Sequence, residues 1–216
     1  MPNLNTTPTS TPVKKYIMAV SGLLLIGFII IHGLGNSTIF LGRVTFLAYA
    51  EHLHKLGPFL ILMQVSLATL FTLHIITGLS LFFQNRKARP IPYIIPNQAQ
   101  TRFASRSMPY SGLTILLFIF VHIYTLHSGE ANTNIADIIA NTLSSPIYAL
   151  LYLAGITALS LHLFHGFCSI FQSIGLTHAH RKHYIKNIIR VTGLWPIVVF
   201  FVIITITMLT SGNILK

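Results

Sequence analysis

Charged side chains are scarce in this chain, and acidic ones are nearly absent. Only 8% of its 216 residues are charged, 14 of them basic and 3 acidic, whereas 53% are hydrophobic. Soluble domains carry about 25% charged residues, so this composition excludes an ordinary water-soluble fold. The basic residues lie in short gaps between apolar runs, as in membrane proteins, and this placement argues against a nucleic-acid-binding protein.

Cysteine occurs only once, as Cys168 inside an apolar run. A single cysteine excludes a disulfide framework, a CxxC motif and an iron–sulfur cluster held by this chain alone. The glycine-rich GxGxxG motif of dinucleotide-binding proteins is also missing. The chain therefore carries no signature of flavin, dinucleotide or iron–sulfur chemistry of its own.

Long apolar runs fill most of the chain after a polar start. Residues 1–15 are rich in threonine and proline, so we predict a flexible tail there. Residues 16–212 are predicted to form one membrane domain, because a transmembrane helix needs about 20 apolar residues and five runs have that length. Uninterrupted runs of this kind predict an all-α, five-helix membrane bundle. The runs are Tyr16–Leu41, Leu56–Phe83, Pro109–His127, Pro146–Ile174 and Ile188–Leu209.

The basic residues also predict the orientation of the bundle. Eleven of the 14 lysine and arginine residues fall in the N-terminal segment and in the second and fourth connections. These three regions lie on one side of a five-helix bundle, and an excess of lysine and arginine marks the cytoplasmic side. We therefore expect the N-terminus in the cytoplasm and the C-terminus outside.

Eleven histidines are unexpected in so apolar a chain, and five of them lie inside the runs. An ionisable residue within a transmembrane helix is a candidate functional residue. The five are His32, His74, His122, His162 and His165. All but the last lie about 20–24 Å from the start of their helices, at 1.5 Å per residue.

The alternating direction of the helices sorts these histidines into two pairs. His32 and His122 are expected in the outer half of the membrane, and His74 and His162 in the inner half. Two histidines from different helices can bind one haem iron on its two faces, so the pattern predicts two haems b between helices one to four. Proton-relay or packing histidines are the alternative, and zinc is weaker because no acids or cysteines accompany them. His165 remains ambiguous.

Glycines lie near all four histidines. Gly78 and Gly166 each follow a histidine by four residues and share a helix face with it, which leaves room for a flat macrocycle. Gly22, Gly27 and Gly112 precede the other two histidines. Ordinary close packing of helices is the alternative explanation for all of them.

The order of these features resembles the dihaem cytochrome b subunit of bacterial succinate dehydrogenases and fumarate reductases, of the five-helix, single-anchor type. The resemblance covers roughly residues 15–190, and its matching stretches are SGLLLIGFIIIHGLGN, TLHIITGLSLFFQNRKARP, YSGLTILLFIFVH and LHLFHGFCSIFQSIG. It implies axial ligands at His32, His74, His122 and His162. Gly166 and Gly175 fit the family's spacing from His162, which is why we prefer it to His165. Ser160 stands where some members have a glutamate that carries protons.

The resemblance also implies partners and a location. Family members carry a flavoprotein subunit and an iron–sulfur subunit on the cytoplasmic face of the bacterial inner membrane. They exchange electrons with a membrane quinone, menaquinone or ubiquinone, and the membrane subunit is not catalytic by itself. The same helices and haems would also suit the cytochrome b of a formate dehydrogenase, hydrogenase or nitrate reductase. A proton-coupled transporter with relay histidines is a rival of another class.

Three polar connections are further candidates. Residues 85–106 form a long basic loop that suits docking of the iron–sulfur subunit, although orientation alone explains its charges. The outer connection offers Arg43, Glu51, His52, His54 and Lys55 for a quinone or for haem propionates, or simply a polar surface. A further cluster, expected to be a solvated loop rather than a metal site, comprises His178, His180 and His183.

Overall fold

The structure, a computed structural model, describes residues 11–87, 99–127, 133–173 and 195–211. Within these ranges every regular element is a helix and no strand occurs. The elements are α1 Thr11–Asn36, the 3₁₀ helix η1 Ser37–Leu41, α2 Arg43–His54, α3 Pro58–Lys87, α4 Ala99–His127, α5 Ile135–Ser144, α6 Pro146–Ser173 and α8 Trp195–Ser211.

Four of the helical segments are long and apolar enough to cross a membrane. They are Pro12–Leu41, Pro58–Lys87, Ser107–Leu126 and Pro146–Phe167. These segments agree with the first four apolar runs and give the all-α membrane architecture expected from the sequence. In the fifth run, residues 188–194 lie outside the described ranges, and α8 covers the remainder with 17 residues. A fifth crossing therefore stays a prediction.

Two helices begin earlier than the sequence predicted. Helix α1 begins at Thr11, so the last five residues of the predicted tail are helical. Pro12 is compatible with this start because a helix makes no use of the N–H groups in its first turn. Helix α4 begins at Ala99, which places Pro109 inside the helix rather than near its start. Pro109 has no backbone N–H, so one hydrogen bond of the helix is lost there. The helix nevertheless extends on both sides of this residue.

Two short helices, α2 and α5, form a cap at one end of the bundle, where the sequence predicted only loops. The side chain of Asn134 accepts a hydrogen bond from the backbone N–H of Asp137 at 3.1 Å and so caps α5. The guanidinium of Arg43 on α2 donates two hydrogen bonds to the Asp137 carboxylate, at 2.6 and 2.9 Å. Buried apolar side chains of the cap include Phe46 and Leu143, which share a cluster with Met208 of α8.

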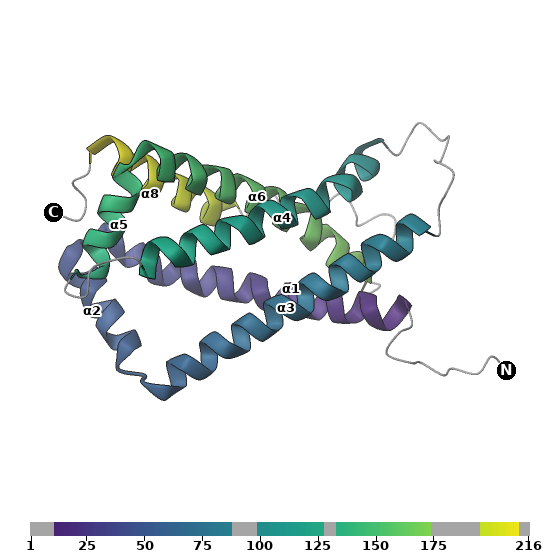
Figure 1. The fold of residues 1–216 in the computed structure, drawn as a ribbon, viewed down its shortest axis with the longest axis horizontal. Helices are drawn as coiled ribbons and strands as arrows, with labels where there is room; N and C mark the ends of the chain where they lie inside the picture. The colour runs from purple at the N-terminus through teal and green to yellow at the C-terminus, as the bar shows by residue number, and fades with distance from the viewer. Residues whose placement is uncertain (1–10, 88–98, 128–132, 174–194, 212–216) are drawn as a thin grey trace.

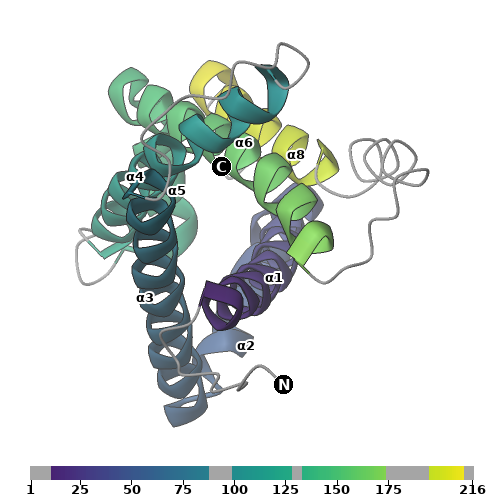
Figure 2. The ribbon, with the colours of Figure 1, turned by 90° about the vertical axis from the view of Figure 1, so that its right-hand side faces the viewer.

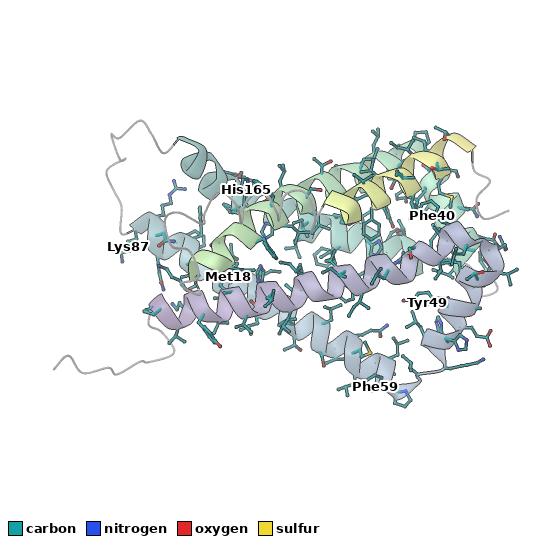
Figure 3. The ribbon with its side chains drawn as sticks, turned by 180° about the vertical axis from the view of Figure 1, so that it is seen from behind. Met18, Phe40, Tyr49, Phe59, Lys87 and His165 are labelled. Carbon is teal, nitrogen blue, oxygen red and sulfur yellow. The ribbon has the colours of Figure 1, made fainter. Side chains whose placement is uncertain are left out.

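The long helices extend along the length of the molecule, with α3 crossing α1 at an angle (Figure 1). Helix α1 packs against α3 and α6, and α4 packs against α6. Helices α1 and α3 lie close near the start of α1 and separate toward α2, which joins their other ends (Figure 1). The view along the bundle places α3 on one side, with α1 and α6 across from it (Figure 2). Met18 and Lys87 mark one end, and Phe40 and Phe59 the other (Figure 3).

Most of the surface of these helices is apolar. On α3 the exposed side chains include Ile61 at 62% and Leu62 at 60%, and Thr77 is the buried residue of this helix. A soluble monomer rarely exposes large contiguous apolar patches. Lipid contact accounts for such a surface, so the polar groups that lie between the helices become the informative ones.

Candidate cofactor site

The first pair of histidines lies between α3 and α6. The ring centroids of His74 and His162 are 6.3 Å apart, and the two ring planes are inclined by 67°. Both side chains are half-buried. The two residues are 88 positions apart in the chain, and the packing of the helices brings them together. We call them the inner pair, and His32 and His122 the outer pair, after the halves of the membrane in which the sequence predicts them.

The second pair lies between α1 and α4. The ring centroids of His32 and His122 are 6.0 Å apart, and the planes are close to perpendicular at 86°. The structure thus brings together the two combinations that the sequence grouped by depth. His165 contacts the ring of its neighbour Phe164, with centroids 5.4 Å apart, whereas His162 is the residue that faces His74.

The centroid distance within each pair is close to that of two imidazoles bound to one metal ion. Metal bonds to a histidine nitrogen are about 2.0–2.1 Å long, and this nitrogen lies roughly 1.1 Å from the ring centre. Two imidazoles bound to one metal from opposite sides therefore have centroids roughly 6.3 Å apart. The inner and outer pairs, at 6.3 and 6.0 Å, both fit this arrangement.

The donor set indicates which metal centre would fit. Among the described residues, no three histidine, cysteine, aspartate or glutamate side chains lie close enough together to hold a metal ion. A zinc site usually takes about three or four protein ligands. In a haem the porphyrin supplies the equatorial nitrogens, so only the two axial positions are left for the protein. Isolated pairs of facing imidazoles match a haem.

A serine hydroxyl contacts Nδ1 of each ring of the inner pair. Ser21 Oγ of α1 lies 3.0 Å from His74 Nδ1, and Ser111 Oγ of α4 lies 3.1 Å from His162 Nδ1. Both serines are nearly inaccessible, with exposures of 2% and 8%. The hydrogen bonds engage Nδ1 and leave Nε2 as the nitrogen available to a metal. Reasoning from the sequence missed both serines.

Glycines next to these serines let the rings lie against the helix backbone. A Cβ added at Gly22 would lie 3.3 Å from Cε1 of His74, and one added at Gly112 would lie 3.5 Å from Cε1 of His162. The contact at Gly22 is tighter than most real Cβ contacts, so a side chain there would press on the His74 ring, whereas the contact at Gly112 is an ordinary van der Waals distance. Gly78 and Gly166 face the ends of the Met18 and Met108 side chains, and their expected role of leaving room for a macrocycle stays a prediction.

The outer pair has a different polar environment. The Tyr152 hydroxyl lies 3.3 Å from His122 Nδ1 and 2.8 Å from Thr125 Oγ1, and Thr125 donates to the His122 carbonyl at 3.1 Å. On His32, the Asn36 amide donates to the backbone carbonyl at 2.8 Å and lies 3.4 Å from Nε2. The two histidines of this pair therefore have unlike partners.

Aromatic rings enclose the outer pair. His32 stacks with Phe28 of its own helix, at a centroid distance of 5.4 Å, and with Phe201 of α8, at 6.1 Å. The ring of Phe118 contacts both His122, at 5.7 Å, and Tyr152, at 5.2 Å. Helix α8 carries no histidine, and it contacts this pair through the ring of Phe201.

An internal repeat relates the two halves of the site. The pattern M-x-x-S-G-L followed by eight residues and a histidine occurs at 18–32 and again at 108–122. In the second helix of each half, a proline precedes the histidine by 16 residues and a glycine follows it by four. The helix pairs α1/α3 and α4/α6 have the most extensive packing among the described helices. Each histidine pair therefore joins equivalent residues of two similar halves.

The remaining candidates are separate from the histidine pairs. At the cap formed by α2 and α5, Glu51 pairs with Lys55 at 2.8 Å, and His54 Nδ1 lies 2.8 Å from the Ala50 carbonyl oxygen. The hydrogen bond from Lys55 lowers the pKa of Glu51, and that from Arg43 lowers the pKa of Asp137. Residues 88–98, which are half of the predicted docking loop, lie outside the described ranges, as does the histidine cluster of residues 178–183.

A groove of about 590 Å³ runs between α4 and α6 on the outside of the bundle. Its lining includes Tyr110, Ser111 and Thr157 among apolar residues such as Leu153 and Leu161. Because Ser111 also contacts His162, the groove reaches the immediate surroundings of the inner pair.

No protein-family model, curated protein or solved structure matches this chain. The functional conclusion therefore depends on the geometry of the histidine pairs and on the sequence resemblance.

Proposed function

We propose that this chain is the membrane-anchor and electron-transfer subunit of a bacterial succinate:quinone oxidoreductase. In this proposal His74 and His162 ligate an inner haem b, and His32 and His122 ligate an outer haem b. The observation that carries the proposal is the pair of facing imidazole couples, each at the spacing of a bis-histidine metal complex. The order of the motifs in the chain supports the choice of family.

The levels of the two pairs suit transfer of electrons across the membrane. Ser21 marks the inner level on α1 because it contacts His74, and His32 marks the outer level eleven residues later. Eleven residues of helix correspond to about 16 Å. The same separation recurs on α4 between Ser111 and His122. Two haems at these levels would form a path between the two membrane surfaces.

The protein's own contribution is ligation, orientation and exclusion of water. A bound haem supplies one-electron chemistry through the change of its iron between the ferric and ferrous states. The histidines hold the iron, and the serine and tyrosine hydroxyls fix the orientation of the rings. The phenylalanines around the outer pair exclude water, which sets the polarity that the cofactor experiences.

The groove between α4 and α6 is the proposed approach of the quinone. It is open to the lipid phase and combines an apolar lining with the hydroxyls of Tyr110 and Thr157. Hydroxyl groups of this kind can donate hydrogen bonds to quinone carbonyls. Because Ser111 belongs both to the groove and to the surroundings of His162, a quinone there would lie close to the inner haem.

The test of the proposal is a reduced-minus-oxidised visible spectrum of the full chain purified in detergent, with haem measured as the pyridine haemochrome. We expect two haems b per chain. A colourless preparation, obtained after expression with sufficient haem, would contradict the proposal. That result would favour the alternative function, a transporter whose histidines relay protons.

A second measurement distinguishes succinate oxidoreductase from other dihaem cytochromes b. The chain is purified from its native membranes, and the subunits that accompany it are identified. We expect a flavoprotein and an iron–sulfur protein, together with succinate:quinone activity. A molybdenum- or nickel-containing partner would instead indicate a formate dehydrogenase, nitrate reductase or hydrogenase.

A further inference from the structure

The two serines of the inner pair make the same set of contacts in both halves of the protein. Ser21 Oγ lies 3.2 Å from the Met18 carbonyl oxygen and 3.0 Å from His74 Nδ1. Ser111 Oγ lies 3.0 Å from the Met108 carbonyl oxygen and 3.1 Å from His162 Nδ1. Residues 90 positions apart thus repeat one hydrogen-bond geometry, which indicates a shared role.

A serine hydroxyl has a single proton, and this limits the roles it can play. When that proton is donated to the backbone carbonyl three residues earlier, the oxygen is left with lone pairs only. Such an oxygen can accept a hydrogen bond from a protonated Nδ1 of the histidine. A neutral imidazole protonated at Nδ1 has its remaining lone pair on Nε2, the nitrogen that must bind a metal.

We propose that Ser21 and Ser111 are positioning residues that hold His74 and His162 in the Nδ1-protonated tautomer, with Nε2 presented to the inner haem iron. The inference rests on the proposed function and adds to it the residues that orient the ligands. In the described part of the chain no serine contacts the rings of the outer pair in the same way: Tyr152 contacts His122, and Asn36 contacts His32. The serines therefore act on one haem and not on the other.

The surroundings explain why a hydroxyl performs this task. Ser21 and Ser111 are buried between apolar helices, where an unpaired Nδ1–H would lose a hydrogen bond that water cannot replace. A carboxylate in this position would bring a buried charge, whereas a hydroxyl satisfies both the ring and the helix carbonyl without one. Each hydroxyl also increases the basicity of its ligand only moderately.

The main experiment compares haem potentials in Ser21→Ala and Ser111→Ala with those of the wild-type chain. In Ser21→Ala, loss of the acceptor makes the His74 imidazole less basic and favours the ferrous iron, so the midpoint potential of the inner component should become more positive. The shift in Ser111→Ala should be smaller, because the backbone of Met108 also hydrogen-bonds to His162. The double variant should show the larger shift, and the outer component should keep its potential. Low-spin electron paramagnetic resonance signals should change for the inner haem only.

Two further variants separate the hydrogen bond from simple loss of packing. Ser21→Thr retains a hydroxyl and should bring the potential back toward the wild-type value. Ser160→Ala is the matched control, because Ser160 lies on α6 two residues from His162 but bonds only to the Ile156 carbonyl in the contacts described, at 2.6 Å. Unchanged potentials in both serine-to-alanine variants would overturn the inference. An equally large change of the inner midpoint potential in Ser160→Ala would also overturn the inference. So would a potential in Ser21→Thr that is as far from the wild-type value as that of Ser21→Ala.

A measurement on the full chain without haem keeps this inference distinct from the proposed function. Nitrogen-15 shifts of labelled histidine report which ring nitrogen carries the proton, and signals are assigned by their loss in His74→Gln and His162→Gln. We expect the Nδ1-protonated form for both residues and a mixture of tautomers after the alanine substitutions. The Nε2-protonated form in the wild-type chain would overturn the inference, whether or not the chain binds haem.

Discussion

The hydroxyl oxygen of Tyr152 lies 3.3 Å from Nδ1 of His122. Tyr152 belongs to α6 and His122 to α4, so this contact joins the two helices of one half at the level of the outer pair. The same hydroxyl lies 2.8 Å from Thr125 Oγ1, which donates to the His122 carbonyl oxygen at 3.1 Å. His122 of the outer pair therefore contacts a phenol hydroxyl, whereas the two histidines of the inner pair contact serine hydroxyls.

Removing this hydroxyl should affect only the outer haem. In Tyr152→Phe the ring contacts with Phe118 and His122 can persist, but Nδ1 of His122 loses its partner. We expect the midpoint potential of the outer component to rise while the inner one stays unchanged, as measured by a redox titration of the visible spectrum. A shift in the inner component would show that the two components have been assigned in the wrong order.

Substitution of the ligands should reveal the pairing directly. His74→Ala and His162→Ala should each halve the haem content and remove the same spectral component, because one axial ligand alone leaves the iron weakly held. His32→Ala should remove the other component. Haem is measured as the pyridine haemochrome. His165→Ala is the control and should retain both components, since His162 is the residue that faces His74. Loss of both components from a folded single variant would contradict two independent sites.

Gly155 should tolerate no side chain. A Cβ at this position on α6 would collide with the ring of Phe118, which itself contacts His122 and Tyr152. Overpacking of this kind costs about 1–3 kcal/mol, so Gly155→Ala should lower thermal stability and disturb the outer spectral component. Gly27→Ala is the matched control because no atom lies within 4 Å of its added Cβ. Alanine there should be neutral or slightly stabilising. Equal behaviour of the two variants would contradict the packing described.

The ion pair between Arg43 and Asp137 predicts that the stability of the cap formed by α2 and α5 depends on pH. Its hydrogen bonds lower the pKa of Asp137, so the pair stabilises the fold above the ordinary aspartate value of about 3.9. This stability is lost as the pH falls through the lowered pKa of the folded state. Asp137→Asn should therefore melt earlier than wild type at pH 6, with the difference vanishing under strong acid. Circular dichroism melts in detergent measure this difference.

A second ion pair in the cap provides the control for this experiment. Glu51 and Lys55 are exposed, at 66% and 63%, and lie one turn apart on or next to α2. Exposed pairs of this type contribute little to stability, so Glu51→Gln should leave the melting temperature nearly unchanged across the same range. A larger effect for Glu51→Gln than for Asp137→Asn would contradict the role of the inter-helix pair.

Sequence reasoning recovered the long helices because each one is a continuous apolar run, and apolarity over about 20 residues is a local property. It placed helix starts less well, as at Thr11 and Ala99, because helices extend into polar flanks that hydropathy does not mark. It missed α2 and α5, whose stability depends on packing with η1 and α8 and on a contact between residues 94 positions apart. The serines beside the inner pair carried a readable signal, the repeated M-x-x-S-G-L pattern.

The sequence by itself indicated a membrane protein and predicted the depth of its histidines, because composition decides partition into lipid and helical rise converts position into depth. It could group His74 with His162 and His32 with His122, but only by level in the membrane. The tertiary structure decided which ring nitrogens face serine or tyrosine hydroxyls, and it placed His162 rather than His165 against His74. Side-chain direction across a helix interface depends on how both helices rotate and cross, which no single run of residues specifies.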